Sequence, residues 1–184
     1  MAVSARRGTP LTLQEILGTA LRLIDAGGVE SLSMRKLAAE LDVNPMSLYH
    51  HVANKTELIR TVCLNVAPTL QPPPDDGAPW PDQLRALAHA YRRLARTHPW
   101  LWRYVHNHPE VIAPRQGGLW EVLERILCAA QVPEEERDRT ADVLHAFVSG
   151  FVLAENLGHI AEEEGELAFD TAINLITAGL RDHR

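Results

Sequence analysis

Cysteine is scarce in this sequence, and long apolar runs and strand-like alternation are absent from it. The two cysteines, Cys63 and Cys128, lie among apolar residues in helical patterns, which favours buried free thiols over a disulfide or a metal pair. No apolar run approaches the ~20 residues of a membrane span. No segment alternates apolar and polar residues with period two, so an all-α fold is predicted. Cysteine redox chemistry and a membrane-spanning role are not indicated.

The N-terminal segment MAVSARRGTP lacks the apolar core of a signal peptide, so we expect a cytoplasmic protein. Hydrophobic residues make up 46% of the 184 residues, which is ample for a buried core. Nothing in the composition calls for a cofactor, and none is expected.

Charge is unevenly distributed along the chain. Residues 1–67 hold seven Lys/Arg and six Asp/Glu, a net charge of +1, whereas residues 68–184 hold eleven and eighteen, a net charge of −7. An acidic surface repels nucleic acid, so the C-terminal part cannot be a nucleic-acid surface. If the protein binds DNA, the N-terminal part must do it.

Four helices are predicted in the first 67 residues from their capping signals. A side-chain oxygen at the N-cap accepts from a free backbone N–H, and proline at the first helical position has no N–H to leave unpaired. The predicted helices begin after Thr12 (a capping box with Glu15), Ser33, Asn44 (followed by Pro45) and Asn54 (followed by Glu57). Gly27-Gly28 ends the first helix, and Pro68 ends the fourth.

The stretch PTLQPPPDDGAPWP has no usable periodicity and is predicted to be a surface connection. Beyond it, helical spacing of apolar residues predicts further helices. They cover residues 81–98, residues 119–127, a long span from Pro133 to about Glu164, and a final stretch containing residues 169–180. A short aromatic segment, WLWRYV, follows the first of them. The expected organisation is a DNA-binding domain (1–53), a connecting helix (54–67), a Pro-rich linker (68–80) and a helical domain (81–184).

The second and third helices, joined by a four-residue turn, form a predicted helix-turn-helix, whose second helix can enter a DNA major groove. Leu48 and Val52 are its inward positions, which leaves an unusual outward set for a purely structural helix. That set is Pro45, Met46, Ser47, Tyr49 and His50. Proline and methionine can contact thymine methyl groups, and serine and tyrosine can bond base edges or phosphates. Arg35 can meet a guanine or the backbone, and Lys55 at a helix start suits a phosphate.

The segment SLSMRKLAAELDVNPMSLYHHVANKTEL resembles the DNA-binding region of the tetracycline-repressor (TetR) family of bacterial regulators, from about Thr12 to Val62. By position, the resemblance implies base reading by Arg35, Pro45, Met46 and Ser47, and DNA backbone contacts by Ser33, Tyr49, His50, His51 and Lys55. Met34, next to Arg35, is also expected to belong to the DNA-binding set. Asp42 stands where the family usually has Gly in the turn. Aspartate tolerates left-handed backbone conformations better than most residues, so we expect the turn to form.

The resemblance also implies a homodimer whose C-terminal helical domain binds a small effector. Ala146, Gly150, Ala154 and Gly158 recur every four residues, so the last two helices are expected to form the dimer interface. Candidate effector contacts are the aromatic residues and the polar positions of the long helix, weighed against ordinary core or dimer roles. They are Trp100, Trp102, Tyr104, Trp120, Leu123, His145, Ser149, Glu155, Asn156 and His159.

The HNH triplet, His106 to His108, invites comparison with a nuclease or metal site. Such a site needs a surrounding set of metal ligands, which the sequence does not offer, so a polar loop is the simpler interpretation and no metal site is assigned. The acidic EEEGE, Glu162 to Glu166, is interpreted as a solvated helix end.

The leading hypothesis is an effector-responsive transcriptional regulator that binds a pseudo-palindromic DNA operator as a homodimer and is released by a small-molecule effector. The resemblance implies a repressor, but the sequence alone does not give the sign of regulation. One alternative is an enzyme in the C-terminal domain with an appended DNA-binding module; no ordered nucleophile, phosphate loop or metal set supports it, and the chain is expected not to be an enzyme. Another alternative is a constitutive DNA-binding protein without an effector. The sequence leaves the effector and the operator unidentified.

Overall fold

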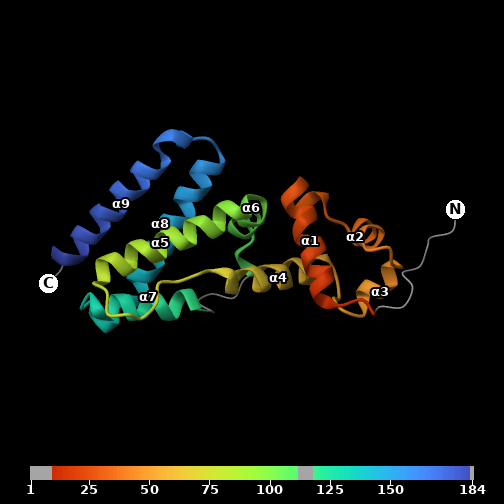
Figure 1. Ribbon diagram of the computed structural model, residues 1–184, viewed down its shortest axis with the longest axis horizontal. Helices are drawn as coiled ribbons and strands as arrows, with labels where there is room; N and C mark the ends of the chain where they lie inside the picture. Colours follow the sequence, from red (N-terminus) through yellow and green to blue (C-terminus); the bar gives the residue numbers. More distant parts are fainter. Residues whose placement is uncertain (1–9, 112–117, 183–184) are drawn as a thin grey trace. The chain divides into compact units, whose positions relative to one another are not determined.

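The computed structural model describes residues 10–111 and 118–182, and within them every regular element is helical, which confirms the predicted all-α fold (Figure 1). Contacts divide the chain into two units. The first contains α1 (Leu13–Gly27), η1 (Val29–Ser31), α2 (Met34–Glu40), α3 (Pro45–Tyr49), α4 (Lys55–Val66), α6 (Pro99–Asn107) and η3 (Pro109–Val111). The second contains η2 (Ala67–Thr69, whose first residue is assigned to the first unit), α5 (Trp80–Thr97), α7 (Gly118–Ala129), α8 (Glu134–Asn156) and α9 (Glu162–Asp182).

The four predicted N-caps of the first unit are present. Thr12 accepts from the Glu15 backbone N–H, and the Glu15 carboxylate accepts from the Thr12 N–H, so the capping box is complete. The side chains of Ser33, Asn44 and Asn54 each accept a backbone N–H in the first turn of α2, α3 and α4. Local side-chain chemistry therefore fixes where each of these helices begins.

The turn between α2 and α3 has the left-handed residue that the sequence predicted. Asp42 adopts φ 53°, and the Val43 N–H donates to the Ala38 carbonyl at 3.0 Å, closing the end of α2. Leu48 of α3 is fully buried, and Val52 just beyond it is 4% exposed. These two apolar anchors fix α3 in the first unit.

The structure assigns α6 to the first unit, whereas the sequence boundaries grouped all of residues 81–184 together. His98, just before α6, lies with Nδ1 3.0 Å from a carboxylate oxygen of Asp25 on α1. Leu101 is buried, and the Trp100 ring covers Gly28, where an added Cβ would lie 3.4 Å from the ring. Gly28 has φ 79° and no side chain, so it accommodates both the turn and the ring.

The long helix of the second unit ends earlier than predicted. α8 stops at Asn156 because Gly158 takes φ 74° and a Schellman motif closes the helix: the Gly158 N–H donates to the Glu155 carbonyl and the His159 N–H to the Ala154 carbonyl, both at 2.9 Å. The predicted extension to Glu164 was wrong. The acidic run from Glu162 begins α9 instead, where negative charge suits the helix N-terminus.

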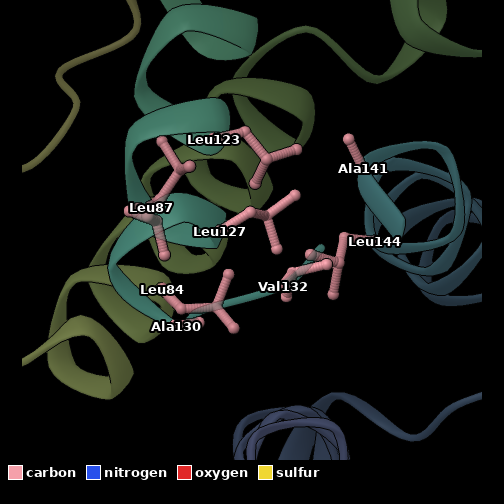
Figure 2. Close-up of a cluster of buried hydrophobic side chains, with 9 residues drawn as sticks. Leu84, Leu87, Leu123, Leu127, Ala130, Val132, Ala141 and Leu144 are labelled. Atoms are coloured by element: carbon pink, nitrogen blue, oxygen red, sulfur yellow. The ribbon is translucent and has the colours of Figure 1, made fainter. Parts of the chain in front are cut away.

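The core of the second unit lies between α5, α7 and α8 (Figure 2). Leu84 and Leu87 of α5 face Leu123 and Leu127 of α7, and Leu144 of α8 closes the cluster, with Ala130 and Val132 from the turn between α7 and α8 beside it. Phe169 and Ile173 are the buried apolar residues of α9. The predicted effector residues Leu123 of α7 and His145 of α8 are therefore positioned by this core.

Candidate nucleic-acid interface and ligand site

The first candidate site is the exposed side of α3. With Leu48 buried, Met46 is 64% and Tyr49 45% exposed, and both His50 and His51 are exposed. A methionine and a tyrosine exposed to this extent on a five-residue helix bury little apolar area within the protein. They are therefore available to a partner surface.

The remaining residues of the predicted interface lie on the neighbouring elements. Arg35 is exposed on α2, Met34 is half-buried beside it, and Pro45 and Ser47 are half-buried on α3. The Ser33 hydroxyl accepts from the Lys36 N–H and so acts as a cap. Lys55 begins α4, where backbone N–H groups are free, and is half-buried. All ten predicted residues thus belong to one substructure of α2, α3 and the start of α4.

The second candidate site is a polar corner in the apolar core of the second unit. The Tyr91 hydroxyl of α5 lies 2.6 Å from Nε2 of His145 and 3.2 Å from the Ser149 hydroxyl. The Trp120 and His145 rings lie 5.1 Å apart. Burial raises the pKa of the Tyr91 hydroxyl, so it stays a neutral donor at physiological pH. The structure thus brings together four predicted effector residues, Trp120, Leu123, His145 and Ser149, around a tyrosine that the sequence indicated only as core.

A cavity of about 30 Å³ adjoins this corner. Its walls are apolar except for Tyr91 and His145, and none of them carries a Lys, Arg, Asp or Glu side chain. They are Leu84, Leu87, Ala88, Tyr91, Leu119, Leu123, Leu144, His145, Phe147, Val148 and Ile173. A space of this size holds about one water molecule, far below the ~300 Å³ of a small-molecule site. The site is therefore closed in this conformation.

The aromatic residues of α6 do not line this cavity. Trp100 covers Gly28 and carries the Arg103 guanidinium 4.7 Å from its ring centroid. Tyr104 stacks on His108 with centroids 4.1 Å apart, and Trp102 is half-buried. All of these contacts lie in the first unit, so Trp100 and Tyr104 support the packing of α6.

The polar residues at the end of α8 also lie outside the cavity. Asn156 and His159 are exposed. Glu155 is bound by Arg92 of α5, which donates to its two carboxylate oxygens at 3.1 and 2.6 Å. Arg92 also donates to Glu166 of α9 at 2.6 Å, so one guanidinium joins three helices.

Arg92 is the residue that sequence reasoning missed. It is 3% exposed, and its guanidinium lies 4.7 Å from the Phe169 ring centroid and 5.6 Å from that of Phe151. Hydrogen bonding to Glu155 raises the pKa of Arg92 further above its ordinary value. The sequence gives no signal for this role, because Arg92, Arg93 and Arg96 look alike until the fold separates them.

The HNH triplet is not the polar loop that the sequence predicted, because His106 and Asn107 are the last residues of α6 and His108 follows as its C-cap. Nδ1 of His108 lies 2.9 Å from the Tyr104 carbonyl oxygen, and His106 is exposed. Among the described residues, the group with metal-ligand spacing is His89, Glu166 and Asp170, whose ligand atoms lie within 4.8 Å of one another. Arg85 and Arg92 already bind these carboxylates, and the hydrogen bond from His89 lowers the pKa of Asp170. We therefore assign no metal to it.

The outer faces of α8 and α9 carry exposed apolar residues. Val143 on α8 is 63% exposed, and Leu157, directly after α8, is 49% exposed. On α9, Leu167 is 74% and Leu175 70% exposed. Ala146 and Gly150 lie exposed between the α8 positions, with no atom within 4 Å of an added Cβ at Gly150. We call these six residues the α8–α9 apolar stripe.

In the described part of the chain, no helix combines the length and hydropathy needed to cross a bilayer.

Comparison with known proteins places these features in a family. Residues 16–62 match the N-terminal domain of bacterial regulatory proteins of the tetR family, and residues 72–181 match the tetracyclin repressor-like C-terminal domain. The repressor DrrR1 of Streptomyces coeruleorubidus is 37% identical over 118 residues, 63% of this chain and 43% of its own length. The match thus spans less than half of that relative.

Two solved structures share the fold over nearly the whole chain. BioQ of Mycobacterium smegmatis superposes with a TM-score of 0.79 at 27% identity, covering 95% of this chain and all of that one. ActR of Streptomyces coelicolor, in complex with (S)-DNPA, gives a TM-score of 0.78 at 25% identity, covering 96% of this chain and all of that one. Since the two domain matches together cover most of its length, the chain belongs to the TetR family of bacterial regulatory proteins.

Proposed function

We propose that this protein is a transcriptional repressor that acts in the bacterial cytoplasm, binds a pseudo-palindromic operator as a homodimer and leaves it when a small molecule binds. The single observation that carries the proposal is α3, with Leu48 buried and Met46, Tyr49, His50 and His51 exposed. A BioQ protein of the same fold has been solved with its double-stranded DNA operator. Binding, rather than catalysis, is the proposed activity.

Specificity is proposed to come from two groups of residues. Base edges are read by Arg35, Pro45, Met46 and Ser47, whereas the DNA backbone is contacted by Ser33, Tyr49, His50, His51 and Lys55. Met34 belongs to the same proposed interface, beside Arg35. One short recognition helix covers too few base pairs for useful specificity, so two copies about 34 Å apart along the DNA are required. The α8–α9 apolar stripe is the proposed dimer interface, since its exposed leucines need a partner surface.

The proposed effector is a small, largely apolar and uncharged molecule with one or two hydrogen-bonding groups. The cavity walls are uncharged, and the corner of Tyr91, His145 and Ser149 is the place where a ligand hydroxyl or carbonyl can be bonded. ActR structures with (S)-DNPA and with actinorhodin place ligands in a protein of the same fold.

Release follows from the closed cavity. A ligand larger than about 30 Å³ fits only a conformer in which α5, α7, α8 and α9 have moved apart, so it stabilises that conformer selectively. The cavity helix α5 continues through His98 into α6, which the His98–Asp25 pair attaches to α1. This connection, together with α4, is the proposed route by which effector binding changes the position of α3.

Selection of bound sites from random DNA with the purified full chain tests the proposal. We expect a two-fold symmetric site and a dimer in sedimentation. Effector and operator binding should be coupled reciprocally: saturating operator should weaken effector binding by the same factor by which effector weakens operator binding, about 5- to 150-fold. Random or asymmetric DNA recovered together with a monomer would overturn it. A compound that binds tightly in the second unit without changing operator affinity would overturn the effector part alone.

A further inference from the structure

The proposed DNA-binding segment of this chain has no net fixed charge. Residues 33–57 contain three cations, Arg35, Lys36 and Lys55, and three acids, Glu40, Asp42 and Glu57, so their fixed charge is zero. DNA binding draws most of its affinity from cations that neutralise phosphates. A neutral module has little of that affinity to offer from its lysines and arginines.

The same segment contains two adjacent histidines, His50 and His51, directly after α3. Both are exposed, and within the described part of the chain neither ring has a hydrogen bond or an ion pair. Histidine is the side chain that gains or loses its charge between pH 5 and 8. Protonation of both rings would raise the charge of residues 33–57 from zero to +2, and that of the DNA-binding surface of a dimer by +4.

Among the described residues, none of the charged groups on the surrounding elements forms an ion pair or a hydrogen bond with the two imidazole rings. On α2 they are Arg35, Lys36 and Glu40, in the turn Asp42, and on α4 Lys55 and Glu57, whose carboxylate is bound by Arg60 at 3.2 Å. The nearest strong anions in a DNA complex would be the phosphates. A phosphate beside an imidazole favours its charged form, so DNA binding and proton binding reinforce each other.

We propose that His50 and His51 make operator binding proton-linked: the protein takes up protons as it binds DNA, and its affinity for the operator rises as the pH falls from 8 to 6. This inference rests on the proposed DNA-binding function. In physical terms, two exposed imidazoles add positive charge to a segment in which three cations are balanced by three acids.

The test measures the dissociation constant of the full chain for the DNA site recovered by selection, by fluorescence anisotropy at pH 6, 7 and 8 and constant ionic strength. We expect binding to tighten on the order of tenfold from pH 8 to pH 6, and the salt slope to steepen by about 0.9 per added phosphate contact. Calorimetry in two buffers of different ionisation enthalpy should show net proton uptake at pH 7.

Three variants separate charge from structure. His50→Gln combined with His51→Gln should bind with little pH dependence, and His50→Lys combined with His51→Lys should bind tightly at both pH values. His159→Gln, an exposed histidine of the second unit, should keep the pH dependence of the unmodified chain. Circular dichroism establishes that each variant is folded.

The outcomes are distinguishable. An unchanged pH dependence in the double Gln variant, or no proton uptake on binding, would overturn the proton linkage while leaving the DNA-binding function intact. Failure of the unmodified chain to bind any DNA at pH 6 or pH 8 would overturn the proposed function and this inference together.

Discussion

Arg92 of α5 donates through Nε and Nη2 to the two carboxylate oxygens of Glu155 on α8, at 3.1 and 2.6 Å, with both side chains largely removed from water. Replacing Arg92 by Leu leaves the Glu155 charge buried without its partner. We expect the free energy of unfolding to fall by about 3–5 kcal/mol, measured by urea denaturation.

Two controls test whether the cost comes from the unpaired charge. Arg93→Leu, at an exposed position of the same helix, should change stability by less than about 0.5 kcal/mol. Combining Arg92→Leu with Glu155→Leu should recover part of the loss, because the pair is then removed as a whole. Equal losses of stability for Arg92→Leu and Arg93→Leu would contradict a stabilising role of the Arg92–Glu155 ion pair.

Gly165 lets α9 approach the same ion pair. A Cβ at this position would lie 2.8 Å from Oε1 of Glu155 and 3.4 Å from Nη2 of Arg92. Gly165→Ala should therefore lower the free energy of unfolding by about 1–3 kcal/mol, because the new methyl group displaces the ion pair. The melting temperature should fall accordingly. Gly18→Ala, in a helix with nothing within 4 Å of the new methyl group, should raise stability by about 0.5–1 kcal/mol. A stabilised Gly165→Ala would show that the side chains move aside without loss.

Lys55 is proposed to bind a phosphate at the start of α4. Lys55→Ala should weaken binding to all DNA sequences alike and reduce the salt slope by about 0.9 per lost contact, hence about twice that per dimer. Anisotropy titrations at four salt concentrations measure it. Arg93→Ala, in the second unit, is the matched loss of one positive charge and should leave the slope unchanged. If the two variants have the same slope as the parent, Lys55 makes no phosphate contact.

The α8–α9 apolar stripe should hold the dimer together. Leu175 is 70% exposed in the single chain, so Leu175→Glu should leave the protomer folded but place a charge in the interface. We expect the dimer dissociation constant to rise at least about 30-fold in sedimentation equilibrium. Leu13→Glu, at a 39% exposed position on α1, should leave it unchanged. An unaffected dimer in Leu175→Glu would move the interface elsewhere.

The two cysteines should differ sharply in reactivity. Burial raises the pKa of the Cys63 thiol to about 12. Cys128 is exposed on α7, so the sequence prediction of two buried thiols holds for Cys63 and was wrong for Cys128. At pH 8 the thiolate fraction of Cys63 is on the order of 10⁻⁴, so a thiol reagent should label Cys128 first and Cys63 only after unfolding. Stopped-flow labelling of Cys128→Ser and Cys63→Ser separates the two rates. Fast labelling of Cys128→Ser in the native state would show that Cys63 is accessible.

The N-terminal helices were predictable because each signal acts within a few residues. Thr12, Ser33, Asn44 and Asn54 cap the helices that the sequence assigned to them, and Asp42 takes the left-handed conformation that its side chain tolerates. Gly158, which ends α8 in a Schellman motif, was also a local signal for the end of a helix. The apolar and acidic residues beyond Gly158 continued the helical pattern, so the predicted helix ran past its true end.

The sequence by itself determined the all-α class, the starts of α1 to α4 and the outward residues of α3, since caps, turns and periodicity depend on neighbours in the chain. The tertiary structure decided which unit α6 joins, through His98, Asp25 and Gly28, and which arginine becomes buried. It also decided that Tyr91, His145 and Ser149 meet beside a closed cavity, whereas Asn156 and His159 do not. These outcomes depend on contacts between residues more than fifty positions apart. Helical periodicity predicts on which side of its helix a residue lies, but it does not identify the side chain that the residue contacts on another helix.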